Sequence, residues 1–228
     1  SFAMHGASVI GVDSNEAIAA DLKCGRTTQT EKVGNKTITE ILREESAHGS
    51  YRVTTDGAAA IRESNAVILT VGLPIDPTSG DPIYTAFEGA TRTIGENIQA
   101  GTVVLVRSTV VPGTTETFCL PLIEKLSGLK AGKDFFIAYV PERIAEGKAF
   151  DEFVTMPTLI GASDEKTASL AEQIIRINST AEIIHSDSII AVETAKVLEN
   201  LQRDTNIAIV QEFARFAENA GMDTFEVI

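Results

Sequence analysis

The stretch ASVIGVDSNEAIAADL, residues 7–22, decides the fold class. A short apolar run ends in Asp13, and a helical pattern follows it at once. This order is typical of the second strand of a dinucleotide-binding unit, whose terminal acid reaches the ribose hydroxyls. Such a unit also needs a glycine-rich loop about 20 residues earlier, but only SFAMHG precedes the stretch. Either Asp13 is an ordinary strand-end carboxylate, or the chain starts partway into a longer design.

The same alternation of apolar runs and helical patterns continues along the chain. Strands are expected at 8–13, 51–55, 66–71, 102–109, 134–140, 158–163 and 181–186, with helices near 14–24, 37–47, 83–98, 114–127 and 164–176. This alternation predicts a Rossmann-like α/β domain over residues 1–186, with a mainly parallel sheet and helices on both faces. Ligands of such sheets bind at the carboxyl ends of the strands.

The character of the sequence changes over residues 187–228. More than 30 residues follow without proline or internal glycine, from Asp187 or Ser188 as the N-cap to Gly221 as the stop. Apolar residues recur broadly enough to bury more than one face. We expect a long helix that links two domains or packs against its copy in a dimer, followed by the start of a dimerisation domain.

The composition excludes several classes of protein. The 228 residues carry a formal net charge of −13, which disfavours nucleic acid and anionic membranes as partners. No apolar run is long enough to span a membrane. The two cysteines, Cys24 and Cys119, match neither a metal spacing nor a disulfide framework. We therefore expect reduced thiols, no metal site and a cytoplasmic protein.

Two turns at strand ends carry candidate ligand-binding groups. In VRSTVVPGTTET, residues 106–117, Ser108 and Thr109 end a strand, and Thr114 or Thr115 is the expected helix N-cap. Hydroxyls and free amides there suit a phosphate or a water, although the spacing alone favours an ordinary strand–turn–helix connection. In VGLPIDP, residues 71–77, small residues allow a ligand close to the backbone.

The segment YVPERIAEGKAF, residues 139–150, concentrates charge at the end of a buried strand. Glu142, Arg143, Glu146 and Lys148 follow one another within seven positions. Such a group can orient a substrate or exchange protons. It is equally compatible with a solvated loop of self-paired charges.

A polar stripe runs along the long helix. Lys196 and Asn200 lie four residues apart, and Arg203 and Asn206 extend the same face. The flanking positions are apolar, so we interpret the stripe as facing a cavity shared with the sheet edge; the alternative is the wet side of an amphipathic helix.

Five of these motifs occur in order at fitting separations. They are GVDSNEA (11–17), VGLPIDP (71–77), VRSTVVPGTTE (106–116), VPERIAEGKA (140–149) and VETAKVLENLQRDTNIA (192–208). Together they resemble the UDP-glucose/GDP-mannose dehydrogenase family, and most of all its branch acting on UDP-N-acetyl-D-mannosamine. The resemblance implies oxidation of the C6 alcohol of a nucleotide sugar to a carboxylate with two NAD⁺ per turnover. It further implies an aldehyde, a cysteine-bound thiohemiacetal and a thioester on the way, and a role in surface polysaccharide synthesis.

The resemblance also implies roles for individual residues. The expected cofactor-binding residues are Asp13 at the adenosine ribose, Val71, Gly72, Pro74, Ser108 and Thr109 along the dinucleotide, and Glu146 near the nicotinamide. The expected catalytic residues are Thr109, which helps to hold a water, Glu142, which assists hydrolysis, Lys196, which stabilises the oxyanion, and Asn200. The expected substrate-binding residues are Glu142, Arg143, Lys196, Asn200 and Arg203, the last near the substrate or the dimer seam. The long helix would form a homodimer interface.

Two parts of the family pattern are absent from the sequence. These are the glycine loop of the first βα unit and the Gly-Gly-x-Cys segment with its nucleophile, and neither Cys24 nor Cys119 has that context. We therefore expect that the chain starts inside the first helix of a larger enzyme and ends before its second nucleotide-sugar domain. Alone, it would bind NAD weakly and would not turn over.

Three other interpretations remain. A UDP-glucose or UDP-N-acetylglucosamine 6-dehydrogenase would use the same chemistry. A non-catalytic nucleotide-sugar-binding or dimerisation module is the alternative from another class. A short-chain 3-hydroxyacid dehydrogenase also pairs a Rossmann unit with a Lys-x-x-x-Asn helix, but PERIAEG, residues 141–147, disfavours it.

Overall fold

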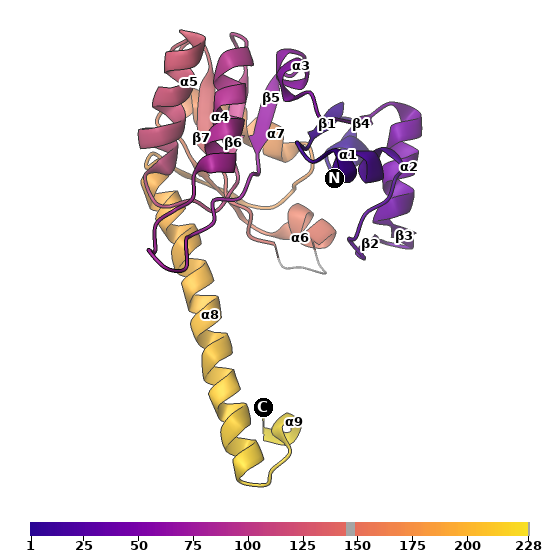
Figure 1. The fold of residues 1–228 in the computed structure, drawn as a ribbon, viewed down its shortest axis with the longest axis vertical. Helices are drawn as coiled ribbons and strands as arrows, with labels where there is room; N and C mark the ends of the chain where they lie inside the picture. The colour runs from indigo at the N-terminus through magenta and orange to yellow at the C-terminus, as the bar shows by residue number, and fades with distance from the viewer. Residues whose placement is uncertain (145–148, 228) are drawn as a thin grey trace.

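The computed structural model describes residues 1–144 and 149–227 (Figure 1). Within these ranges the strands are β1 (Val9–Val12), β2 (Lys32–Val33), β3 (Lys36–Thr37), β4 (Tyr51–Thr54), β5 (Ala66–Leu69), β6 (Val103–Val106), β7 (Phe136–Tyr139), β8 (Thr158–Gly161) and β9 (Ile183–Ser186).

The helices alternate with these strands, as the sequence predicts. They are α1 (Glu16–Lys23), α2 (Ile38–His48), α3 (Gly57–Arg62), α4 (Thr85–Asn97), α5 (Leu120–Ser127), α6 (Ala149–Thr155), α7 (Glu165–Arg176), α8 (Ile189–Asn219) and α9 (Thr224–Val227), with a 3₁₀ turn at Ala3–His5 and a π-helical turn, η2, at Thr115–Cys119.

The main sheet has five strands in the order β5-β6-β7-β8-β9. β5, β6 and β7 are parallel, with Ala66 opposite Val103 and Val103 opposite Phe136. β8 joins antiparallel through a single pair, Tyr139 with Gly161, and β9 is parallel to β8. The predicted mainly parallel sheet is therefore confirmed.

One expectation about the sheet needs correction. β1 and β4 pair in parallel as a separate two-stranded sheet, with Val9 opposite Tyr51. Among the described residues, no strand pairs with both β1 and β5, so these two strands belong to different sheets. Residues of β1 stay partly exposed as a result, and Val12 is 49% exposed.

Helices cover both faces of the five-stranded sheet (Figure 1). On one face α4, α5 and the start of α8 contribute to the larger core cluster, which includes Phe87, Ile94, Ile123, Ile189 and Val192. On the other face α7 buries Ala171 and Ile175 against β6, β7 and β8. This three-layer arrangement confirms the predicted Rossmann-like architecture.

The long helix α8 begins and ends close to the predicted residues. Ser188 is its N-cap and accepts the N–H of Ala191 at 3.3 Å, and Gly221 follows one residue after the C-cap Ala220. Its first two turns pack on the sheet, and the rest projects away from it (Figure 1). The projecting part exposes large apolar side chains, including Leu201, Phe213 and Phe216. Among the described residues, no helix has the length and apolarity needed to cross a membrane.

Candidate active site

Three parallel strands end at one edge of the sheet and carry the predicted site. The Val71–Pro74 turn follows β5, Ser108 and Thr109 follow β6, and Glu142 follows β7. The Ser108 hydroxyl is buried and donates to the Leu69 carbonyl at 3.3 Å. Thr109 beside it is exposed, so its side chain is accessible to a ligand.

The turn after β5 leaves room for a bound molecule. Gly72 is exposed, and a Cβ added to it would meet no atom within 4 Å. The next residue, Leu73, packs against the larger core cluster and anchors the turn. A dinucleotide can therefore approach this backbone closely without displacing a side chain.

Asp13 follows β1 of the smaller sheet, as predicted. It is half-buried, and its Oδ1 accepts the N–H of Asn15 at 2.8 Å. Asn15 in turn caps α1 by accepting the N–H groups of Ala17 and Ile18. The carboxylate thus has a fixed position at the carboxyl end of a parallel strand, which suits a ribose ligand.

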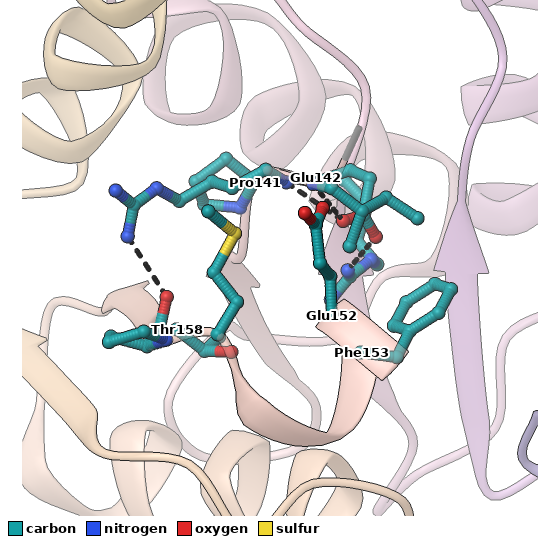
Figure 2. A pocket seen from close by; sticks show the side chains of 10 residues that line it. Pro141, Glu142, Glu152, Phe153 and Thr158 are labelled. Atoms are coloured by element: carbon teal, nitrogen blue, oxygen red, sulfur yellow. Dashed lines mark hydrogen bonds and ion pairs between the residues drawn. The ribbon is translucent and has the colours of Figure 1, made fainter. Parts of the chain in front are cut away.

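Among the described residues, three donors hold the carboxylate of Glu142 (Figure 2). Its Oε2 accepts from the guanidinium of Arg107, and its Oε1 accepts the N–H groups of Arg143 at 2.8 Å and Ile144 at 3.0 Å. A cavity of about 20 Å³, lined by Glu142, Arg107 and Phe153 among others, lies beside it. One water needs about 10–15 Å³, so this space accommodates a water next to the carboxylate.

Arg143 connects the strand end to the long helix. Its Nε donates to both carboxylate oxygens of Glu199, at 2.8 and 3.0 Å, and its Nη1 donates to the Pro157 carbonyl at 2.9 Å. This bidentate contact fixes the segment after β7 against α8. Glu146, the other acid predicted here, lies outside the described residues.

Lys196 is the buried member of the predicted polar stripe. It is 7% exposed, and burial lowers the pKa of its ammonium, an effect that the Glu199 carboxylate opposes and that Arg203 reinforces. Glu142 and Arg143 also act on its pKa, so the structure brings Lys196 within electrostatic reach of the strand end. Of the predicted stripe, Lys196 is thus buried, whereas Asn200, Arg203 and Asn206 are exposed in this chain, where α8 leaves the sheet. That the stripe faces a cavity stays a prediction.

The structure corrects the predicted helix cap after β6. The Thr114 hydroxyl donates to the Val111 carbonyl at 2.6 Å instead of accepting from the helix start. The buried hydroxyl of Thr115 has no hydrogen-bond partner within residues 1–144 and 149–227. The cap comes from α8: the fully buried carboxylate of Glu193 accepts the N–H groups of Gly113 at 2.5 Å and Thr115 at 2.9 Å. A longer-range acid replaces the local hydroxyl because it satisfies two N–H groups at once.

Two anchoring residues, Arg107 and Glu193, were not predicted from the sequence. Each had a signal: Arg107 directly precedes the Ser108–Thr109 pair, and Glu193 is a lone acid in an apolar stretch one turn before Lys196.

Comparisons with known proteins identify the family of the chain. Residues 1–179 match the NAD binding domain of the UDP-glucose/GDP-mannose dehydrogenase family, and residues 191–228 match its central domain. The chain belongs to this family. The first matched region is an NAD binding domain, which confirms NAD as the expected cofactor.

Relatives of this family are similar over the whole chain. The UDP-N-acetyl-D-mannosamine dehydrogenase of Pyrococcus horikoshii is 34% identical over 100% of this chain and 52% of its own length. The UDP-N-acetyl-D-glucosamine 6-dehydrogenase of Pseudomonas aeruginosa is also 34% identical, over 97% of this chain and 50% of its own. The chain thus spans about half the length of these relatives.

Solved dehydrogenase structures have the same fold. The P. horikoshii UDP-D-ManNAc dehydrogenase structure superimposes with a TM-score of 0.88 and covers 100% of this chain and 52% of that one, at 34% identity. A ternary complex of GDP-mannose dehydrogenase from Pseudomonas aeruginosa has a TM-score of 0.88 at 31% identity, covering 99% of this chain and 51% of its own.

Proposed function

We propose that the protein carrying this chain is an NAD-dependent nucleotide-sugar 6-dehydrogenase. It would oxidise the C6 alcohol of a UDP-N-acetylhexosamine, with UDP-N-acetylmannosamine favoured, to the uronate in two steps. The observation that carries the proposal is the strand edge where Glu142 follows β7, Ser108 and Thr109 follow β6 and the open turn at Gly72 follows β5. Lys196 is buried in the part of α8 that packs on the same sheet. The chain alone would bind NAD weakly and would not turn over.

The cofactor would lie along the carboxyl ends of the strands. Asp13 would accept from the ribose hydroxyls, and Val71, Gly72, Pro74, Ser108 and Thr109 would line the dinucleotide. NAD⁺, when bound, supplies the hydride acceptor for carbon C6. Glu146 would lie near the nicotinamide.

The substrate would be held from α8 and the segment after β7. Lys196 would stabilise negative charge on the oxygen at C6, since a cation in a water-poor site acts strongly on developing charge. Asn200 would hydrogen-bond the same region, and Arg143 and Arg203 would lie near the substrate or the dimer seam. Thr109 and Glu142 would hold and activate the water of the hydrolytic step, and the 20 Å³ cavity beside Glu142 supports this assignment.

NADH formation by the full-length protein tests the function. The assay compares UDP-N-acetylmannosamine, UDP-N-acetylglucosamine, UDP-glucose and GDP-mannose by kcat/KM. The largest value for UDP-N-acetylmannosamine supports the proposal, and the largest value for UDP-glucose favours the alternative substrate. Nucleotide-sugar binding without NADH from any of the four favours the non-catalytic binding or dimerisation module.

We also propose that the protein is a cytoplasmic homodimer. The projecting part of α8 exposes Leu198, Leu201, Val210, Phe213 and Phe216, which a second copy would cover. The free thiols of Cys24 and Cys119 fit a reducing compartment. Sedimentation of the full-length protein tests the dimer: Phe213→Glu should dissociate it, and an unchanged sedimentation coefficient would contradict this interface.

A further inference from the structure

Arg107 has an unusually fixed position for a residue at the edge of the sheet. Its backbone N–H donates to the Leu69 carbonyl at 2.9 Å, which ties it to the end of β5. Its side chain is only 10% exposed, and the guanidinium carbon lies 5.8 Å from the centre of the Phe153 ring, within cation–π range. The sheet therefore fixes the backbone of Arg107, while the aromatic ring and Glu142 contact its guanidinium.

The carboxylate of Glu142 is oriented by these contacts. An ionised carboxylate has about four lone-pair sites. Arg107 occupies one on Oε2, while the N–H groups of Arg143 and Ile144 occupy two on Oε1. A water bound at the remaining site would meet Glu142 from a single direction, and the adjoining cavity accommodates one water.

We propose that Arg107 is the positioning residue of Glu142: its guanidinium sets the direction in which the carboxylate faces the water of the hydrolytic step. The backbone N–H groups hold only Oε1, and because rotation about the Cγ–Cδ bond moves both oxygens together, a second bond on Oε2 restrains this rotation further. The planar guanidinium holds the second oxygen through a charge-assisted bond. The catalytic part of this inference rests on the proposed function, whereas the structural part does not.

The structural part is tested by NMR on the ¹⁵N-labelled chain. Arg107→Met removes the cation but keeps an apolar side chain against Phe153. Glu142→Gln replaces the carboxylate and supplies the reference chemical shifts of the neighbouring backbone N–H groups. In Arg107→Met the N–H resonances of Arg143 and Ile144 should move toward their Glu142→Gln positions. Unchanged resonances of both amides would overturn the proposal, whatever the enzyme does.

The catalytic part is tested by rapid-mixing measurements of NADH in the full-length protein with UDP-N-acetylmannosamine. Arg107→Met should lower the steady-state rate about tenfold or more, while the NADH formed in the first turnover persists as a burst, because only hydrolysis is slowed. Arg107→Lys should restore part of the rate. Arg52→Met, which breaks an exposed ion pair with Glu63, is the matched control and should behave as wild type.

The outcomes separate the two proposals. An unaltered steady-state rate in Arg107→Met, or equal loss of burst and steady-state rate, would overturn the positioning role. Absence of NADH from the wild-type protein with every nucleotide sugar would overturn the proposed function, and the amide resonances would still decide whether Arg107 holds Glu142.

Discussion

The buried carboxylate of Glu193 accepts the backbone N–H of Thr115 at 2.9 Å, joining residues 78 positions apart in the sequence. A second bond, from the N–H of Gly113, completes the clamp between α8 and the turn after β6. Because Glu193 lies one turn before Lys196, the clamp also fixes the height of that lysine against the strand ends.

Loss of the clamp should be costly. Glu193→Gln keeps the shape but places an NH₂ group opposite one N–H donor, so we expect the free energy of unfolding to fall by about 2 kcal/mol. Urea unfolding followed by circular dichroism measures this. Glu212→Gln, on the exposed part of the same helix, is the control and should change the stability by less than about 0.5 kcal/mol. Equal stabilities of the two variants would show that the clamp contributes nothing.

We expect the buried Lys196 to lower the stability of the fold at neutral pH while it is required for catalysis. Burial lowers the pKa of its ammonium below the ordinary value of 10.5, so between the two values the unfolded chain binds more protons than the folded chain. Wild-type stability should therefore rise with pH across that interval, and the penalty should be full below it. Near neutral pH, Lys196→Met should unfold at a higher temperature than the wild type. Its free energy of unfolding should be larger by about 1 kcal/mol.

In Lys196→Met, the rise of stability with pH should disappear. The full-length protein with the same substitution should no longer form NADH. Thermal melts at several pH values between neutral and 10, read by circular dichroism, measure the first effect. A Lys196→Met protein less stable than wild type at neutral pH would contradict the reasoning.

Gly161 is required for the contact between β8 and α8. A Cβ at this position would lie 3.0 Å from the Ile189 Cα and 3.0 Å from the Val192 Cγ2. Gly161→Ala should therefore lower the free energy of unfolding by about 2 kcal/mol, because the helix backbone has to move. In Gly89→Ala, an exposed position of α4 where nothing lies within 4 Å, stability should instead rise by about 0.5–1 kcal/mol. Chemical unfolding of both proteins checks the opposite signs.

The two cysteines should differ sharply in reactivity. Cys24 is exposed at the end of α1, whereas Cys119 is fully buried and burial raises the pKa of its thiol to about 12. Titration of the native chain with a thiol reagent should modify Cys24 alone, and Cys24→Ser should abolish the reaction. Rapid modification of Cys119 in the folded chain would contradict the assignment of this residue to the core.

The longer elements were predictable from the sequence because each has its own local signal. α8 combines an N-cap serine, an unbroken helical stretch and a terminal glycine, and β6 and β7 are continuous apolar runs that the sheet buries completely. α3 and α6 were missed because six and seven residues are too few to show a helical period.

The site was predictable where it follows strand ends, and not where it depends on packing. Ser108 and Glu142 each follow a strand of the five-stranded sheet, so their shared edge follows from parallel topology. Asp13 likewise follows a strand, but one of the separate sheet of β1 and β4. The roles of Arg107 and Glu193 depend on partners 35 and 80 residues away, such as Glu142 and Gly113, which no local pattern encodes. The division between β1 and β5 was likewise invisible, because strand pairing is a property of the assembled sheet.

Because α8 is long and Glu193 anchors it near its start, a small tilt at Glu193 becomes a large displacement at the far end of the helix. From Glu193 to Asn219 the helix extends about 39 Å, so a tilt of about 5° at Glu193 displaces its far end by about 3 Å. A disturbance of one buried carboxylate, too small to notice at the strand ends, would thus misalign by several ångströms whatever surface meets Phe213 and Phe216. The direction of the projecting part of α8 therefore depends on the two hydrogen bonds of Glu193, together with the Arg143–Glu199 contact.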